Sequence, residues 1–247
     1  MDQVAYLDVV VAQTGALAAA ERAVGPAVTV PATPEWTMAK LVKHCGTTHR
    51  WARAVVETGA FANPGELDLG LPDAEAEYPD WIEIGAAALV ATMRAADPDA
   101  PTWSWGNDPH NRFWSRRMAH ETSIHRWDAE SATGEQAAVE AALAVDGIDE
   151  RLEHLVPSMN FNAAGAGVLH GAGETAHLHC TDADGEWVLR FDPDGFTFTR
   201  EHAKGDVAVR GPASDLLLYL VGRGPLDALD VHGDAGVLDA HAAIRFF

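Results

Sequence analysis

Glu121 and His125 are the two residues whose types and spacing most directly suggest chemistry. They lie four residues apart in RRMAHETSIHRWDAESATG, residues 116–134, which has the pattern of an amphipathic helix. At about 100° per residue this spacing places both side chains on one face, about 40° apart and one turn apart along the axis. A carboxylate and an imidazole so placed could bind one metal ion. The alternative is a surface hydrogen bond, worth roughly a few tenths of a kcal/mol.

His120 suggests a different metal motif, which its spacing excludes. The helix of zinc peptidases carries H-E-x-x-H, whereas this chain carries H-E-x-x-x-H. His120 and His125 are therefore about 140° apart around the helix and cannot share one face. The metal hypothesis thus depends on Glu121 and His125 and on a ligand from another element.

A mononuclear site with an open position needs about three protein ligands, and a second helical segment offers two histidines for the third place. His44 and His49 are five residues apart, about 140° around a helix, so only one can face a given core. His44 lies on the same side as Leu41 and Cys45, which favours it. His49 precedes Arg50 and is expected on a more polar face.

Hydrophobic periodicity predicts four helices in the first half of the chain, over residues 6–24, 37–59, 79–97 and 112–131. Thr37 is the expected N-cap of the second helix and Pro79 suits the first turn of the third. The segments 60–77 and 97–111 lack a period and are predicted to be loops. Four such helices indicate an up-and-down bundle, in whose core facing side chains can assemble a metal site.

The second half of the chain changes from helical to alternating periodicity. After a helical stretch at about 135–155, short strands are expected at 176–181, 186–191, 196–200 and 206–211. The dipeptides Asp184-Gly185 and Asp194-Gly195 predict two hairpin turns. A short apolar helix, one more strand and a last helix complete an α+β unit. We therefore expect a mixed α and α/β chain of two domains, a bundle at 1–150 and an α+β domain at 151–247.

The charge and the N-terminal residues narrow the choice of partners and location. The formal net charge is −20, so the electrostatic field of the protein repels the phosphate backbones of nucleic acids. Nucleic acid is therefore not an expected partner. The N-terminal residues have neither a basic region nor an apolar signal core, and no apolar run approaches the length of a membrane span. We therefore expect a cytoplasmic protein, monomer or homodimer, with no membrane association. The only cysteines, Cys45 and Cys180, are expected to be reduced.

Several of these residues resemble one known family, the mycothiol-dependent maleylpyruvate isomerases. The resemblance rests on Trp36-Thr37 with Leu41 and His44, on ETSIH at 121–125 with Arg126 and Asp128, and on SDLLLYLVGRGP and VHGDAGVLDA in the second half. It implies a DinB-like four-helix bundle at the N-terminus, followed by the C-terminal domain of that family.

The resemblance also implies a set of site residues. The family's metal ligands fall on His44, Glu121 and His125, its metal is typically zinc, and its active-site arginine falls on Arg223. Spacing alone would make Arg223 a turn residue after the preceding helix. The implied partners are a small-molecule substrate and mycothiol, a low-molecular-weight thiol cosubstrate.

A shell of two imidazoles and one carboxylate suits this chemistry. It leaves a position for water or for a thiol, whose pKa a bound divalent cation would lower. The leading hypothesis is a metal-dependent, mycothiol-using isomerase or S-transferase acting on a small, maleylpyruvate-like electrophile. The alternatives are a metal-dependent hydrolase on the same bundle and a non-catalytic ligand-binding protein with a structural metal.

Four other residues near the expected site keep two interpretations each. Cys45 is expected to pack in the core rather than to act as a nucleophile. Asp128 either orients the His125 ring or is a surface charge. Arg116 and Arg117 could meet acidic groups of the substrate or thiol, although a solvated helix face is the commoner place for at least one of them.

Overall fold

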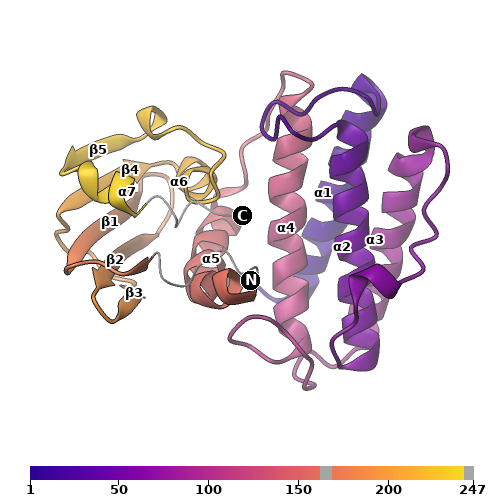
Figure 1. Cartoon of the computed structure of the whole chain (residues 1–247), viewed down its shortest axis with the longest axis horizontal. Coiled ribbons are helices and arrows are strands. Elements are labelled where there is room, and N and C mark those ends of the chain that lie inside the picture. The colour runs from indigo at the N-terminus through magenta and orange to yellow at the C-terminus, as the bar shows by residue number, and fades with distance from the viewer. Residues whose placement is uncertain (162–168, 242–247) are drawn as a thin grey trace. The chain divides into compact units, whose positions relative to one another are not determined.

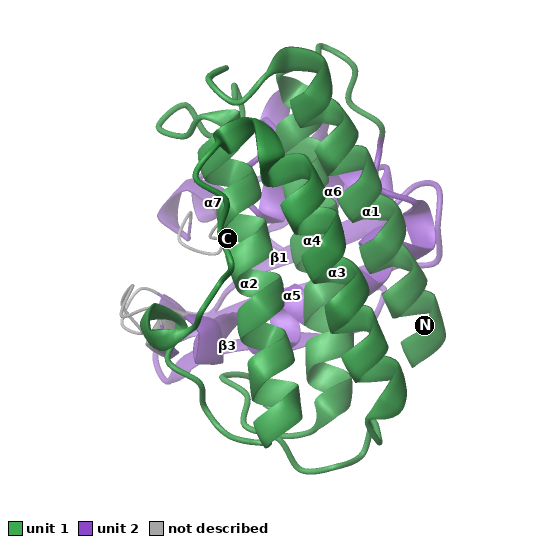
Figure 2. Ribbon diagram, turned by 90° about the vertical axis from the view of Figure 1, so that its right-hand side faces the viewer, with its two compact units in different colours: residues 1–137 green, residues 138–247 purple. Residues whose placement is uncertain are grey.

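The computed structural model describes residues 1–161 and 169–241, and the chain divides into two compact units, residues 1–137 and 138–247 (Figure 2). The expected domain division between residues 150 and 151 falls inside a helix of the second unit. Where the chain divides into independently folding parts stays a prediction.

The first unit is a bundle of four long helices (Figure 1). They are α1 (Gln3–Val24), α2 (Met38–Thr58), α3 (Tyr78–Ala95) and α4 (Asn111–Ser131). α1 packs against α3 and α4, and α2 packs against the same two helices. The predicted four-helix bundle is therefore confirmed, and α2 and α4, which carry the candidate ligands, are neighbours.

The ends of these helices follow their capping residues. The Thr37 hydroxyl accepts a hydrogen bond from the Lys40 N–H at the start of α2, as the sequence predicts. Gly59 ends the helix with φ of 69°, a left-handed conformation that favours glycine. The loop between α2 and α3 contains only two short 3-10 turns, η1 (Pro64–Glu66) and η2 (Glu75–Glu77).

α1 is long and apolar enough, by length and composition alone, to cross a membrane. In this structure Leu7, Val10 and Leu17 are fully buried among side chains of the other bundle helices. The core helix of a bundle satisfies the same length and composition criterion, so this property of α1 is weak support for a membrane span.

Glu21 of α1 is a carboxylic acid buried without a hydrogen-bond partner for either oxygen among the described residues. Burial, and secondarily the charge of Glu75, raises its pKa from 4.5 to about 7. The unfolded chain therefore loses this proton at a lower pH than the folded chain does. Stability is unaffected well below pH 4.5, falls as the pH rises towards 7, and stays reduced above it.

We expect Glu21→Gln to stabilise the protein at pH 8 by up to about 3 kcal/mol and to change stability little at pH 4.5. The amide has nearly the shape of the acid but cannot ionise. Urea denaturation at the two pH values measures the difference, with the exposed Glu66→Gln as the control. An equal effect of Glu21→Gln at both pH values would contradict the burial of an ionising carboxyl.

The second unit is a five-stranded mixed sheet with helices. Its elements are α5 (Ala141–Phe161), β1 (Glu174–Cys180), β2 (Glu186–Asp192), β3 (Gly195–Thr199), β4 (Val207–Gly211), α6 (Ala213–Leu220), the 3-10 turn η4 (Leu226–Ala228), β5 (Asp230–Gly233) and α7 (Gly236–Ala240). β1, β2 and β3 form the predicted meander. β4 then pairs in parallel with β1, so the strand order is β3-β2-β1-β4-β5. The two-domain fold class, a bundle followed by an α+β unit, is confirmed.

The two faces of this sheet differ in polarity because side chains alternate along each strand. One face carries buried side chains, among them Leu178, Trp187 and Val209, and the Trp187 indole N–H donates to Asp149 of α5 at 2.7 Å. The other face carries polar side chains, including His177 and His179 of β1 and Glu186 of β2. The helix α5 thus covers the apolar face.

Candidate functional site

The structure brings His44 of α2 together with Glu121 and His125 of α4. We call these three residues the bundle site. His44 Nε2 donates to Glu121 Oε1 at 3.1 Å, and His125 Nε2 lies 3.3 Å from the same oxygen. One ligand atom from each residue lies within 4.8 Å of the other two. The helical spacing of Glu121 and His125 and the packing of α2 against α4 produce this convergence.

Glu121 is held as an anion by three positively polarised neighbours. Its second oxygen, Oε2, accepts a hydrogen bond from Arg117 at 2.9 Å. Burial by itself would raise the pKa of this carboxyl, but the hydrogen bonds of His125 and His44 and the charge of Arg117 hold that pKa well below its ordinary value. Glu121 therefore stays ionised throughout the neutral pH range, so its carboxylate oxygens are suited to bind a metal ion.

His125 is oriented by Asp128, one turn further along α4. His125 Nδ1 donates to Asp128 Oδ2 at 2.9 Å, and the Asp128 side chain is fully buried. Burial lowers the pKa of His125, but the hydrogen bonds to Asp128 and Glu121 outweigh burial and raise it to about 9. With its Nδ1 proton held by Asp128, the ring turns Nε2 towards Glu121 and His44. Of the two roles expected for Asp128, the structure supports the orienting one.

The site is open on the side of His44. The side chain of His44 is 40% exposed, whereas those of Glu121 and His125 are 14% and 4% exposed. The Trp36 ring, from the segment before α2, stands 4.9 Å from the His44 ring and 6.1 Å from the His125 ring, measured between centroids. Of the three residues, His44 is therefore the one most accessible to a small molecule, and it lies beside an aromatic ring.

The neighbouring histidines lie outside this group. His49 Nε2 donates at 2.9 Å to the Thr122 hydroxyl, which itself donates to the Met118 carbonyl. His49 is fully buried, contrary to the polar face expected from its position before Arg50, and burial lowers its pKa to about 4. His120 packs edge-on against the Tyr6 ring. Neither His49 nor His120 belongs to the bundle site.

Cys45 is fully buried in the bundle core, as expected. Burial raises the pKa of its thiol well above the ordinary value, so the sulfur stays protonated. The chain therefore offers no reactive thiol at this place, and a thiol nucleophile would have to come from another molecule.

Arg223 lies in the turn that follows α6, in the second unit. Its backbone N–H donates to the Leu218 carbonyl at 2.8 Å, and its guanidinium donates to the Val221 carbonyl at 3.2 Å. Gly222, just before it, has φ of 72°. This is the turn position that spacing alone predicts, and a catalytic role for Arg223 stays a proposal.

The donor set of the bundle site fits a divalent transition metal. Two imidazole nitrogens and one ionised carboxylate oxygen are the ligands of many open zinc centres. Asp128 supplies the carboxylate partner that metal-bound histidines usually have behind them. The residues present therefore match the metal that the sequence resemblance implies, and the coordination itself stays a proposal.

Sequence reasoning left the role of Arg117 open and assigned none to Trp36. Arg117 is four residues before Glu121, so an i,i+4 ion pair on the helix was a readable signal. Only 8% of Arg117 is exposed, and it binds a protein carboxylate rather than facing the solvent. Trp36 contacts the site from outside the helices, and no local periodicity predicts such a contact.

Asp128→Asn tests the orienting hydrogen bond. We expect the affinity for Zn²⁺ at the bundle site to fall by about 10–100-fold, because the amide lacks the charge that fixes the ring and strengthens its basicity. Zn²⁺ titration against a competing chelator measures the change. Glu130→Gln, on the same helix but paired with Arg126, is the matched control. Equal affinities of the wild type and the Asp128 variant would contradict this role.

Comparison with known proteins places this geometry in context. Residues 7–130 match the family described as "Mycothiol maleylpyruvate isomerase N-terminal domain", and residues 142–240 match the corresponding C-terminal domain. Two crystal structures of the mycothiol-dependent maleylpyruvate isomerase, one of them of a histidine-to-alanine mutant, are similar to the chain. Each has a TM-score of 0.56 and 16% identity, over 94% of this chain and 93% of the other. This structural likeness shows the fold. No curated protein sequence matches the chain.

Proposed function

The chain belongs to the mycothiol maleylpyruvate isomerase family, and on this premise we propose that it is a metal-dependent, mycothiol-using enzyme. Its substrate would be a small electrophile of the maleylpyruvate type, which it isomerises or to which it transfers the thiol. The observation that carries the proposal is the convergence of His44, Glu121 and His125, with their ligand atoms within 4.8 Å.

His44, Glu121 and His125 would hold the metal, for which we propose zinc. When bound, such a cation lowers the pKa of a thiol at its open position and so supplies a thiolate at neutral pH. The protein's own residues do the rest. Asp128 fixes the tautomer of His125, Arg117 fixes the orientation of Glu121, and the exposed edge at His44 admits the thiol.

The proposed isomerisation needs no net change in atoms or charge. The thiolate sulfur bonds to one carbon of a conjugated cis double bond, and the electron pair moves to the neighbouring carbonyl as an enolate. The former double bond is now single and rotates. The enolate then re-forms the double bond in the trans geometry and expels the thiolate. An S-transfer differs only in that the enolate is protonated and the sulfur stays bound.

Arg223 is proposed as the group that binds the substrate carboxylate or stabilises the enolate, on the strength of the family resemblance. A planar guanidinium can bind a carboxylate through two parallel hydrogen bonds, which a lysine cannot reproduce. We expect Arg223→Lys to lower kcat/KM by about 10-fold or more, the cost of one charge-assisted contact, and to leave the metal content unchanged. Steady-state kinetics and metal analysis measure both. The exposed Arg210→Lys is the control, and unchanged kinetics for Arg223→Lys would remove it from the site.

A thiol and electrophile screen tests the function. The zinc-loaded full chain is incubated with maleylpyruvate or related cis-alkenes and with mycothiol, with glutathione or with no thiol, and the products are separated by chromatography. The proposal expects turnover that depends on mycothiol. Equal turnover without any thiol would indicate a hydrolase instead, and no turnover with substrate binding intact would indicate a binding protein.

A further inference from the structure

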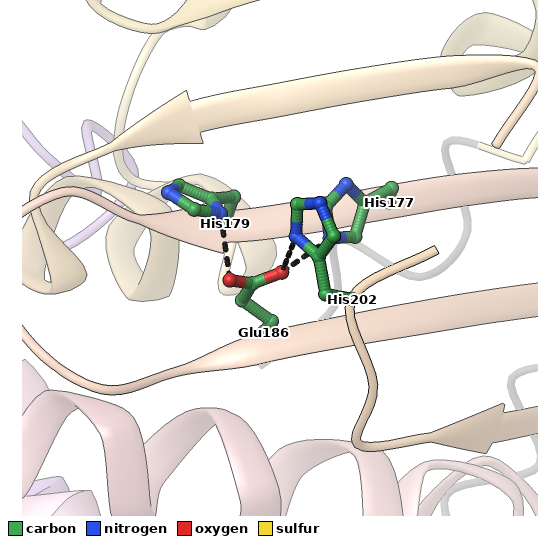
Figure 3. Close-up of side chains that lie close together, drawn as sticks. All are labelled: His177, His179, Glu186 and His202. Atoms are coloured by element: carbon green, nitrogen blue, oxygen red, sulfur yellow. Dashed lines mark hydrogen bonds and ion pairs between the residues drawn. The ribbon is translucent and has the colours of Figure 1, made fainter. Parts of the chain in front are cut away.

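A second group of metal-binding residue types lies on the polar face of the sheet in the second unit (Figure 3). His177 and His179 are two residues apart on β1, so both project from the same face. Glu186 of β2 stands directly opposite His179 in the antiparallel register and shares that face. His202, from the segment between β3 and β4, completes the group. We call these four residues the sheet cluster.

The four side chains converge on one point. Glu186 Oε1 lies 3.1 Å from His179 Nδ1, and Glu186 Oε2 lies 3.1 Å from His177 Nε2 and also contacts His202 Nδ1. One ligand atom from each residue lies within 4.8 Å of all the others. Ligands of a tetrahedral zinc ion, at about 2.0–2.1 Å from the metal, are about 3.3 Å apart. Side-chain adjustments of about an ångström would therefore close the shell.

Three imidazole rings with centroids 5.4–6.1 Å apart surround a single carboxylate, and each has a ring nitrogen against one of its oxygens. The His202 side chain is 78% exposed and would be free to remain in solvent. Its placement over the other three residues is what a shared ligand would favour.

We propose that the sheet cluster is a second zinc site, with three imidazole ligands and one carboxylate ligand. Four protein ligands complete a tetrahedral shell and leave no position for a substrate, which is the arrangement of structural zinc sites. The ion would join the β1–β2 hairpin to the segment that leads into β4. This inference is independent of the proposed function, because the sheet cluster shares no residue with the bundle site.

The surroundings of the sheet cluster suit an ion that enters from solvent. A cavity of about 340 Å³ adjoins it, lined among others by His177, His202 and Lys204. Cys180 lies on the opposite, buried face of the sheet, so among the residues described here no sulfur competes for the ion. Nitrogen and oxygen ligands without sulfur allow Zn²⁺, Co²⁺ and Ni²⁺, of which Zn²⁺ prefers the tetrahedral arrangement.

Zinc titration of the full chain in a His44→Ala background tests the proposal, because that change disables the proposed bundle site. After the protein is stripped with a chelator, Zn²⁺ is added against a competing chromophoric chelator. We expect one equivalent of tightly bound zinc. Adding His179→Ala or His202→Ala should weaken binding by more than about 100-fold, since loss of even an outer-shell partner costs 10–100-fold.

His232→Ala is the matched control, because His232 lies on the same face of the sheet but outside the cluster. It should keep the zinc affinity of the background protein. His202→Ala separates loss of zinc binding from misfolding. Because the His202 side chain is exposed and lies in a loop, its removal should disturb the sheet core little. Circular dichroism should show that this variant is folded without metal.

The melting temperature supplies a second measurement. Zinc should raise it by several degrees in the His44→Ala background and leave it unchanged when Glu186→Gln is added, because binding stabilises only the folded state that has the site. Three results would overturn the proposal: no tightly bound zinc in the His44→Ala protein, undiminished affinity after His179→Ala, or an equal loss of affinity in the His232→Ala control.

Discussion

His44→Ala is expected to remove metal from the bundle site and to lower thiol-dependent turnover by about 10³-fold. Stabilisation of a reacting group by a metal ion contributes several kcal/mol, and each 1.36 kcal/mol corresponds to about tenfold in rate. His44 is the best ligand to replace because it is the most exposed of the three and, among the residues that the structure describes, its ring hydrogen-bonds only to Glu121. The variant should therefore still fold, and its loss of turnover should come from the missing metal rather than from unfolding.

Metal analysis and steady-state kinetics on the same preparations measure both effects. Lys43→Ala, an exposed neighbour on α2, is the control and should retain full activity. Glu121→Gln should lose turnover to a similar extent. Undiminished thiol-dependent turnover in a His44→Ala protein with one fewer bound zinc would mean that the bundle metal is structural and that the reaction takes place elsewhere.

Trp114→Ala is expected to lower the free energy of unfolding of the bundle by about 3–5 kcal/mol, the largest loss of stability that we predict. Trp114 is fully buried near the start of α4, and its indole N–H donates to the Trp103 carbonyl at 2.8 Å. Its ring packs edge-on against Trp51 of α2 and Phe113 of α4, at centroid distances of 5.0 and 5.2 Å. Removing it leaves a cavity that rigid neighbouring rings cannot fill.

Urea denaturation of the full chain, followed by the helical circular dichroism signal, measures this loss. Trp114→Phe is the matched control, which keeps most of the apolar volume but loses the hydrogen bond, and should cost about 1–2 kcal/mol. A loss below about 1 kcal/mol for the alanine variant would show that the aromatic cluster collapses around the gap. Trp114 is thus expected to anchor the bundle core.

Most of the fold could be predicted from local signals in the sequence. The apolar period of 3.6 residues marks all four bundle helices, Thr37 and Gly59 mark the ends of α2, and Asp-Gly pairs mark both hairpin turns. Each of these signals acts within a few residues of the position that it determines. α5 begins and ends later than its sequence pattern indicates, and Pro157 lies inside it.

The parts that could not be predicted depend on contacts between distant residues. The parallel pairing of β1 with β4 brings His177 beside Ala208, and no turn residue encodes that register. The alternation in AHLHC does place His177 and His179 on one face, but their meeting with His202 depends on how the chain returns after β3. The alternation of side chains along β1 therefore predicts that His177 and His179 lie together, but not that the other two residues of the sheet cluster join them.

The bundle site was partly predictable, because two of its three residues lie on one helix. The spacing of Glu121 and His125 is a property of one helix, and it correctly predicts a shared face. The preference for His44 over His49 rested on neighbouring residues, which placed His49 on the more polar face, whereas His49 is fully buried and His44 is partly exposed. His49 points to Thr122 inside the bundle, whereas His44 reaches Glu121 at its exposed edge.

The central position of β1 has a consequence for the order in which the second unit folds. β1 pairs with β2 across a short turn, but with β4 only after the whole of β2 and β3 has intervened. Local pairs form faster than distant ones because less loop entropy is lost in closing them. We therefore expect the hairpin carrying His177, His179 and Glu186 to form early, and His202 to arrive with β4 in the slow step. An ion that binds all four residues would then act late, by slowing unfolding rather than by speeding folding.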